Sequence, residues 1–219
     1  MMSIIEHVVL FKIKEDATQS QIDSMVDRVN SLVSLKETLH LNMVTIQSSS
    51  SSSSFSSSSF THILHIRFTS KEDLHAYAIH PTHLEVIKVN APLVSDIMAV
   101  DWVTEVDGND LVLPYGSAVR VLFFKLKEGL SEQVKDEVLK GISGIRHENA
   151  VQFTCGENFS PARAKGFSFA TLEVFTGLSE LKEVDYDEEF RKYDVNDKIK
   201  ENLDNVLVLD FVANGQIAS

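Results

Sequence analysis

The residues with the clearest potential for chemistry lie in one short stretch, YAIHPTH, residues 77–83. It contains Tyr77, His80 and His83, and His75 lies two residues before it. A histidine with a pKa of about 6.5 can accept a proton at neutral pH, and a tyrosine hydroxyl can donate a hydrogen bond to a developing oxyanion. The stretch could therefore form a catalytic site, a metal site or an ordinary helix corner.

A zinc site is not expected from this stretch. His75, His80 and His83 are spaced five and three residues apart, but Pro81 interrupts any helix face that they could share. No carboxylate stands in a recognised ligand pattern with them, and a chain with one cysteine, Cys155, cannot form a multi-cysteine metal site or an internal disulfide.

Composition and charge exclude several classes of partner. The formal net charge is −12 and the isoelectric point is about 5.0, so the surface repels phosphate backbones and anionic lipid. No apolar run approaches the roughly 20 residues of a membrane span, and the first residues lack the pattern of a signal peptide. We expect no nucleic-acid partner, no membrane insertion and a cytoplasmic location.

The sequence contains an internal repeat. VVLFKIKEDAT (residues 8–18) matches VLFFKLKEGLS (121–131), IRFTSKEDL (66–74) matches EVFTGLSEL (173–181), and DIMAVDWV (96–103) matches NVLVLDFV (205–212). The three blocks occur in the same order, offset by 107 to 113 residues. This self-similarity predicts two copies of one structural unit.

Each unit has the pattern β-α-β-β-α-β. Thr18 and Ser70 are placed to cap the two helical regions of the first unit, and the second of these regions is broken at Pro81. Alternating and short apolar runs predict the strands at residues 4–13, 41–46, 60–68 and 97–103, then at 119–126, 150–155, 166–175 and 206–212. A helix is expected after Ser131 and a helical region over residues 179–203.

This order predicts an α+β fold made of two tandem ferredoxin-like units, at residues 1–107 and 117–219, joined by a linker at 108–116. Each antiparallel sheet has helices on one face only, so its other apolar face needs a cover. We expect the two sheets to pack face to face as an intramolecular pseudo-dimeric α/β barrel, with Trp102 and Phe211 in its core. Because each unit supplies the other's partner, we expect a monomer, although a homodimer is left open.

A serine tract interrupts the first unit. Eleven of residues 48–59 are serine. Serine offers nothing to bury against the ordering cost of the backbone, so a flexible loop between two strands is expected. Regulation by phosphorylation is the alternative interpretation.

Four segments, HVVLFK, THILHIRF, HPTH and IMAVDW, resemble the plant stress-response A/B barrel family. Its members are small dimeric α+β barrels, usually with one unit per chain, so this chain resembles a fused version. The family has no uniform activity, and several plant members are associated with stress or pathogen defence. The resemblance implies a stress-response or defence protein that acts by binding, for example a small hydrophobic ligand, with antimicrobial (antifungal) action as a further option.

One relative in this family is the polyketide cyclase that makes olivetolic acid, and its site suggests an alternative function. Its tyrosine, the histidine six residues later and a histidine on the first strand match Tyr77, His83 and His7. The resemblance then implies an intramolecular aldol condensation, with His83 as base, Tyr77 as oxyanion donor and His7 as orienter. The structural interpretation, in which His80 caps a helix and His83 only forms a hydrogen bond, is favoured unless a pocket of about 300 Å³ or more is reached by Tyr77 and His83 together.

Any such site is expected in the first unit alone. Arg120 stands where His7 would be, and the equivalent of the histidine stretch, residues 184–194, contains no histidine.

The family also suggests a magnesium ion at the end of the first helix. The matching ligands are the main-chain oxygens of Asn30, Val33, Ser34 and Lys36. The last carbonyls of a helix lack intrahelical partners and carry partial negative charge, which favours a cation. A fortuitous crystallisation ion is the alternative explanation, and no cofactor is expected to be required.

Overall fold

The computed structural model describes residues 1–51, 60–183 and 197–214 of the chain. The elements of the first half are β1 (Met2–Ile13), α1 (Gln19–Asn30), η1 (Ser31–Ser34), β2 (Thr38–Thr45), β3 (Ser48–Ser51), β4 (His62–Phe68), α2 (Lys71–Ala78), α3 (Pro81–Asn90), η3 (Ala91–Leu93) and β5 (Val94–Val106). Those that follow are η4 (Gly108–Asp110), β6 (Ala118–Leu126), α4 (Glu132–Ser143), β7 (Gln152–Glu157), η5 (Pro161–Arg163), β8 (Phe169–Phe175), α5 (Leu178–Lys182), α7 (Asp197–Asn202) and β9 (Leu203–Val212).

The strands form two antiparallel sheets. The first has the order β2-β4-β1-β5 and the second has the order β3-β9-β6-β8-β7. Apart from β3, each sheet is built from one half of the chain, which confirms the predicted α+β fold of two ferredoxin-like units. The predicted linker at residues 108–116 lies in the connection between β5 and β6.

The helix boundaries follow from the capping residues. Thr18 and Gln21 form a capping box at the start of α1, and the Ser70 hydroxyl accepts a hydrogen bond from the main-chain nitrogen of Asp73 at the start of α2. His80 caps α3 through its Nδ1, which accepts a hydrogen bond from Thr82 N at 3.2 Å, and Pro81 occupies the first turn. The expected helix break at Pro81 and the capping role of His80 are therefore confirmed.

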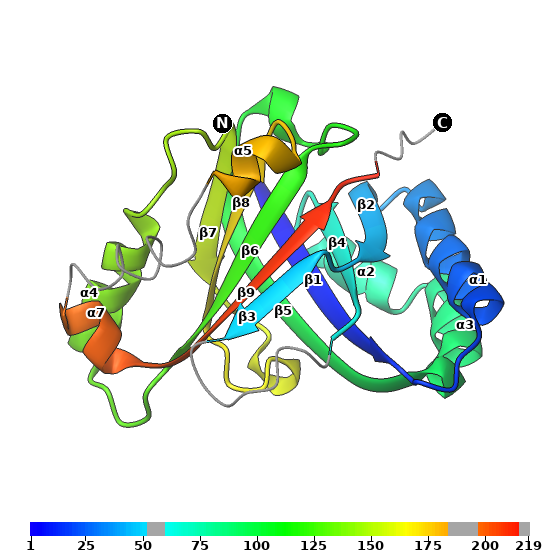
Figure 1. Ribbon diagram of the computed structural model, residues 1–219, viewed down its shortest axis with the longest axis horizontal. Helices are drawn as coiled ribbons and strands as arrows, with labels where there is room; N and C mark the ends of the chain where they lie inside the picture. The colour runs from blue at the N-terminus through cyan, green and yellow to red at the C-terminus, as the bar shows by residue number, and fades with distance from the viewer. Residues whose placement is uncertain (52–59, 184–196, 215–219) are drawn as a thin grey trace.

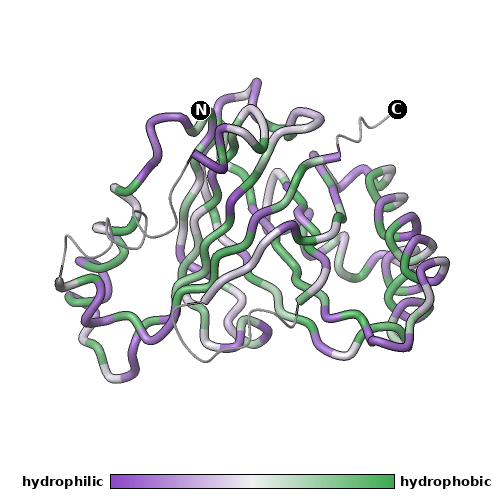
Figure 2. The backbone as a smooth tube through the Cα atoms, viewed as in Figure 1, coloured by the Kyte–Doolittle hydropathy of each residue, from purple (hydrophilic) through white to green (hydrophobic). Residues whose placement is uncertain are grey.

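The inner faces of the two sheets share one core. Alternate residues of β1, β4 and β5 pack against alternate residues of β6, β8 and β9, and Trp102 and Phe211 are fully buried among them. The outer faces are covered by helices: α1, α2 and α3 on the first sheet, α4 and α7 on the second (Figure 1). Figure 2 shows hydrophobic residues along the strands between the two groups of helices. The expected face-to-face packing of the sheets is confirmed.

The two sheets also meet along their edges. On one side β7 lies against β5, with a bridge between Trp102 and Asn158. Gly156 permits this approach, because a Cβ at that position would lie 2.8 Å from the carbonyl oxygen of Val103. On the other side the side chain of Asn42 forms hydrogen bonds with the main chain of Asn214. These contacts close the sheets into a barrel-like structure.

The prediction of a flexible loop over the whole serine tract is wrong for its first residues. Ser48–Ser51 form β3, which pairs with β9 along the edge of the second sheet. Main-chain pairing on an open sheet edge does not depend on the side chain, so a serine sequence can complete it. The rest of the tract, residues 52–59, lies outside the described residues. Residues 184–196, which belong to the helical region predicted over residues 179–203, also lie outside them.

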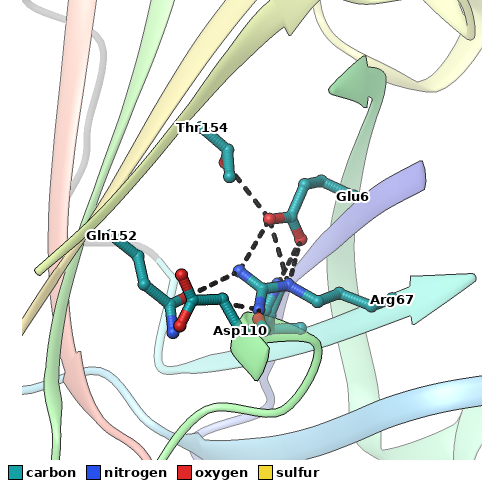
Figure 3. A network of polar contacts seen from close by, with 6 residues as sticks. Glu6, Arg67, Asp110, Gln152 and Thr154 are labelled. Atoms are coloured by element: carbon teal, nitrogen blue, oxygen red, sulfur yellow. Dashed lines mark hydrogen bonds and ion pairs between the residues drawn. The ribbon is translucent and has the colours of Figure 1, made fainter. Parts of the chain in front are cut away.

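A buried polar network crosses the barrel interior between the units (Figure 3). The carboxylate of Glu6 on β1 accepts hydrogen bonds from Arg67 (Nη2 at 2.9 Å) and from the hydroxyl of Thr154 on β7 (3.1 Å). The Arg67 guanidinium also donates to Gln152 Oε1 at 3.3 Å and to the main-chain oxygen of Asp110 in the linker. The charges of Glu6 and Arg67 are therefore paired within the interior.

Candidate active site

A pocket of about 520 Å³ opens between the outer face of the first sheet and the helices α1 and α3. Its lining is mainly apolar, with residues such as Met25, Leu64 and Val86. Tyr77 and His83 both line it. The volume exceeds the size at which a ligand site is plausible, about 300 Å³, and the pocket therefore meets the condition that favours chemistry over a purely structural role.

Tyr77 presents a free hydrogen-bond donor in this pocket. The residue is 2% exposed, and its ring packs against Phe68 and His83, with centroid separations of 5.2 and 4.3 Å. Its hydroxyl has no hydrogen-bond partner among the described residues. Burial raises the pKa of Tyr77 well above its ordinary value of 10.0, so the hydroxyl stays protonated.

His83 is arranged to act as a base. Its Nδ1 lies 3.1 Å from the main-chain oxygen of Ala78, which can only accept, so Nδ1 carries the hydrogen and donates a hydrogen bond there, and Nε2 carries the lone pair. Burial lowers the pKa of His83 below its ordinary value of 6.5, and the hydrogen bond to Ala78 offsets this effect only in part. The imidazole is therefore neutral at physiological pH.

His7 is placed differently from the other two predicted residues. It is buried on β1, its Nδ1 contacts the carboxylate of Asp101 directly across on β5, and it is not among the residues that line the pocket. Its ring packs against Phe68, which also contacts Tyr77. Burial by itself would raise the pKa of Asp101, but the charge and hydrogen bond of His7 lower it overall.

Two polar residues of the pocket carry no signal in the sequence. Asn90, at the end of α3, accepts a hydrogen bond on Oδ1 from Arg28 Nε at 2.9 Å, while its buried Nδ2 has no partner among the described residues. Arg163 comes from η5 in the second unit and lines the pocket of the first. Only the folded arrangement brings these residues to Tyr77 and His83.

Comparison with known families identifies the chain. The model of the Stress responsive A/B Barrel Domain matches residues 5–104 and again residues 118–213. The chain belongs to the stress-responsive A/B barrel family. It carries two copies of the domain, as the internal repeat predicts.

Two stress-response A/B barrel domain-containing proteins of Arabidopsis thaliana are similar to this A/B barrel chain over nearly its full length. One is 42% identical over 213 residues, which cover 95% of this chain and 78% of that protein. The other, DABB1, is 42% identical over 212 residues, which cover 96% of this chain and 97% of DABB1.

Solved structures with the same arrangement share the fold at low sequence identity. A putative monooxygenase from Fusobacterium nucleatum has a TM-score of 0.62 at 13% identity and covers 97% of this chain and 93% of its own. An anthrone oxidase-like protein has a TM-score of 0.60 at 11% identity and covers 100% of this chain and 94% of its own. In the described residues of the A/B barrel chain, no helix is long and apolar enough to cross a membrane.

At one matching pair of positions, the second A/B barrel unit has an arginine opposite an aspartate, whereas the first unit has a histidine opposite an aspartate. Arg120 on β6 lies opposite Asp210 on β9, in the register that His7 and Asp101 occupy in the first sheet. Its Nε and Nη2 lie 2.8 and 3.0 Å from the two oxygens of Asp210. Because a guanidinium does not lose its proton in proteins, this pair cannot exchange protons as an imidazole does.

The predicted magnesium site has suitable donors but is occupied in part by internal contacts. Of the predicted main-chain ligands, the carbonyl oxygen of Val33 already accepts a hydrogen bond from Thr38 Oγ1 at 3.1 Å. Nearby in sequence, the buried Glu37 has an Oε2 without a partner among the described residues. Main-chain and carboxylate oxygens are the donors that magnesium takes, so the site stays a prediction. Among the described residues, no three His, Cys, Asp or Glu side chains are grouped to hold a metal.

Proposed function

We propose that this A/B barrel protein is a lyase-type enzyme that binds a small, mainly apolar carbonyl compound in its first unit and catalyses an intramolecular aldol condensation. One observation carries this proposal: Tyr77 and His83 reach the same pocket of about 520 Å³, one as a free donor and the other as a neutral base. Side chains with a purely structural role, such as filling space or capping a helix, do not require an open pocket of ligand size beside them.

The proposed reaction uses the two residues in sequence. His83 Nε2 removes a proton from a carbon next to a carbonyl group, and the Tyr77 hydroxyl donates a hydrogen bond to the enolate oxygen that forms. The enolate carbon then forms a bond to a second carbonyl carbon of the same molecule. The resulting alkoxide takes the proton from His83, and loss of water completes the condensation. His7, held by Asp101, acts on this site only through its neighbours.

The test is turnover of a tetraketide thioester by purified protein. His83→Ala should lower kcat by about 100-fold or more, which is the usual contribution of general base catalysis. His75→Ala is the matched control, because His75 is exposed on α2, does not line the pocket and should leave kcat unchanged. Turnover that survives His83→Ala would rule out the proposed base.

Binding without chemistry is the second candidate function, and the apolar lining of the pocket favours it. In that case the protein binds a small hydrophobic ligand as part of a stress or defence response. A stress role is in line with the names of the two relatives at 42% identity. Antimicrobial action would then depend on the ligand that is bound. Saturable binding of small apolar compounds with no turnover of any carbonyl substrate would select this function over the first.

A further inference from the structure

We propose that the pocket of the first unit selects an apolar molecule that carries a carboxylate, and that the second unit supplies the counter-charge through Arg163. The inference rests on the proposed function for the location of the site. It concerns binding and not proton transfer, so the two proposals can fail separately.

The loop that carries Arg163 is fastened to the first unit on both sides. Before it, Phe159 N donates to the Asp101 carbonyl at 3.0 Å, and Asp101 N donates to Asn158 Oδ1 at 3.0 Å. After it, Lys165 Nζ lies 2.8 Å from Asp96 Oδ1. These anchors hold η5 across the edge of β5, so Arg163 stays beside a pocket that belongs to the other half of the chain.

The carboxylates nearest to the pocket are already bound by other residues. The carboxylate of Asp96 also lines the pocket, but Lys165 pairs with it and, as the main cause, lowers its pKa. The charge of Arg163 contributes to lowering the pKa of Asp101, but the Asp101 carboxylate is bound by His7. Among the described residues, no carboxylate forms an ion pair with Arg163, although the whole chain has a net charge of −12. A guanidinium is suited to a ligand carboxylate because it can donate two parallel hydrogen bonds.

The buried part of the pocket offers donors that lack acceptors. Arg28 Nε can only donate, so it fixes Oδ1 of Asn90 toward itself and leaves Nδ2 as a free donor in the lining. The Tyr77 hydroxyl is a second free donor. Buried donors without partners are costly, and an oxygen on the apolar body of the ligand would satisfy them. The ligand class is therefore an apolar carboxylic acid with a further oxygen acceptor.

Isothermal titration calorimetry with a matched pair of probes tests the counter-charge. Wild-type protein should bind octanoate about three- to tenfold more tightly than octan-1-ol, a modest preference because Arg163 is exposed to solvent. Arg163→Gln should abolish this preference and leave the affinity for octan-1-ol unchanged. Lys140→Gln, which removes one exposed positive charge from α4 away from the pocket, should retain it.

The outcomes separate the two proposals. Three results would each overturn the inference. The wild-type protein could bind octanoate and octan-1-ol with equal affinity, or bind neither measurably at millimolar concentration. The preference for octanoate could also persist in Arg163→Gln. His83→Ala should keep the preference for octanoate. A protein that keeps this preference but turns over no carbonyl substrate would contradict the proposed reaction alone.

A second variant tests the buried donor. Asn90→Asp keeps an oxygen for Arg28 and replaces the free donor by an acceptor. It should weaken the binding of octan-2-one, whose carbonyl needs a donor, by about fivefold or more, because one hydrogen bond is lost and repulsion between two acceptors is added. Unchanged affinity for octan-2-one would overturn the role assigned to Asn90.

Discussion

At the scale of single residues, the surroundings of His83 set the pH at which it can act. Burial lowers its pKa below 6.5, so the neutral form that acts as base persists to a lower pH than for a free histidine. The pKa of Tyr77 shifts in the opposite direction, because burial raises it above 10.0. The Tyr77 hydroxyl therefore stays protonated and can still donate a hydrogen bond at alkaline pH. The two shifts together predict a broad plateau of activity around neutrality.

The measurement is the pH dependence of kcat/KM, together with an NMR titration of His83 assigned by comparison with His83→Ala. The acid limb should have its midpoint below pH 6.5, and ionisation of Tyr77 should cause no loss of activity up to about pH 10. An acid limb at or above pH 6.5 that follows the His83 resonance would contradict this account of its environment.

The sequence predicts the site residues that lie close together in the chain and misses those that only the folded structure brings together. Tyr77 and His83 are six residues apart, and Pro81 between them fixes a helix corner that turns both toward the same side. Arg163 is 80 residues from His83 and lines the same pocket only because the second unit packs along β5. Asn90 looks like an ordinary helix end until its contact with Arg28 shows which of its side-chain atoms is free.

At the scale of elements, β3 ties the first unit to the second. The hydroxyls of Ser48 and Ser51 donate to Asp210 Oδ2 at 2.8 Å and to Asn205 Oδ1 at 2.7 Å, whereas the Ser50 hydroxyl has no partner among the described residues. Ser48→Ala and Ser51→Ala should each lower the free energy of unfolding by about 0.5–1.5 kcal/mol, the usual net contribution of such a bond. Chemical denaturation measures the change.

Ser50→Ala is the internal control for this strand, because it removes the same hydroxyl from the same strand without removing a hydrogen bond. It should change stability by less than about 0.5 kcal/mol. Three equal effects would contradict the hydrogen bonds assigned to the Ser48 and Ser51 hydroxyls. This strand could not be predicted from the sequence, because a run of serines shows no alternation of apolar and polar residues. The other strands were predictable from alternating or continuous apolar residues.

At the scale of the whole molecule, the two A/B barrel units differ in chemistry but share one core. Their matching strands keep the same register, with His7 opposite Asp101 in one sheet and Arg120 opposite Asp210 in the other. The sequence repeat predicts the shared core. It does not predict the network around Glu6, because the partners of that carboxylate lie on strands from both units.

The interior of the barrel also contains a histidine that should make the whole molecule sensitive to acid. His40 is 1% exposed, both of its ring nitrogens lack partners among the described residues, and its ring lies 5.2 Å from that of His65. Burial is the main cause that lowers the pKa of His40 well below 6.5, and nearby His65 and Arg67 add to the effect. Burial likewise lowers the pKa of His65.

Because these histidines bind protons more readily when the chain is unfolded, their neutral forms stabilise the fold above about pH 6.5, and this contribution is lost as the pH falls below that value. Glu6, whose pKa is also lowered in the fold, adds to the loss below about pH 4.5. Between pH 7 and pH 5, His40 should therefore contribute a loss of stability, because the unfolded chain takes up a proton at this histidine before the folded chain does. His40→Phe keeps a ring of similar shape and removes the titration, so its unfolding free energy should fall by less than that of the wild-type protein over this range. Urea denaturation at pH 7 and pH 5, followed by Trp102 fluorescence and by circular dichroism, measures both falls. Equal falls in the two proteins would show that His40 takes up protons equally in the folded and unfolded states, which would contradict its lowered pKa. Separate transitions for the two probes would show that the units do not unfold as one core.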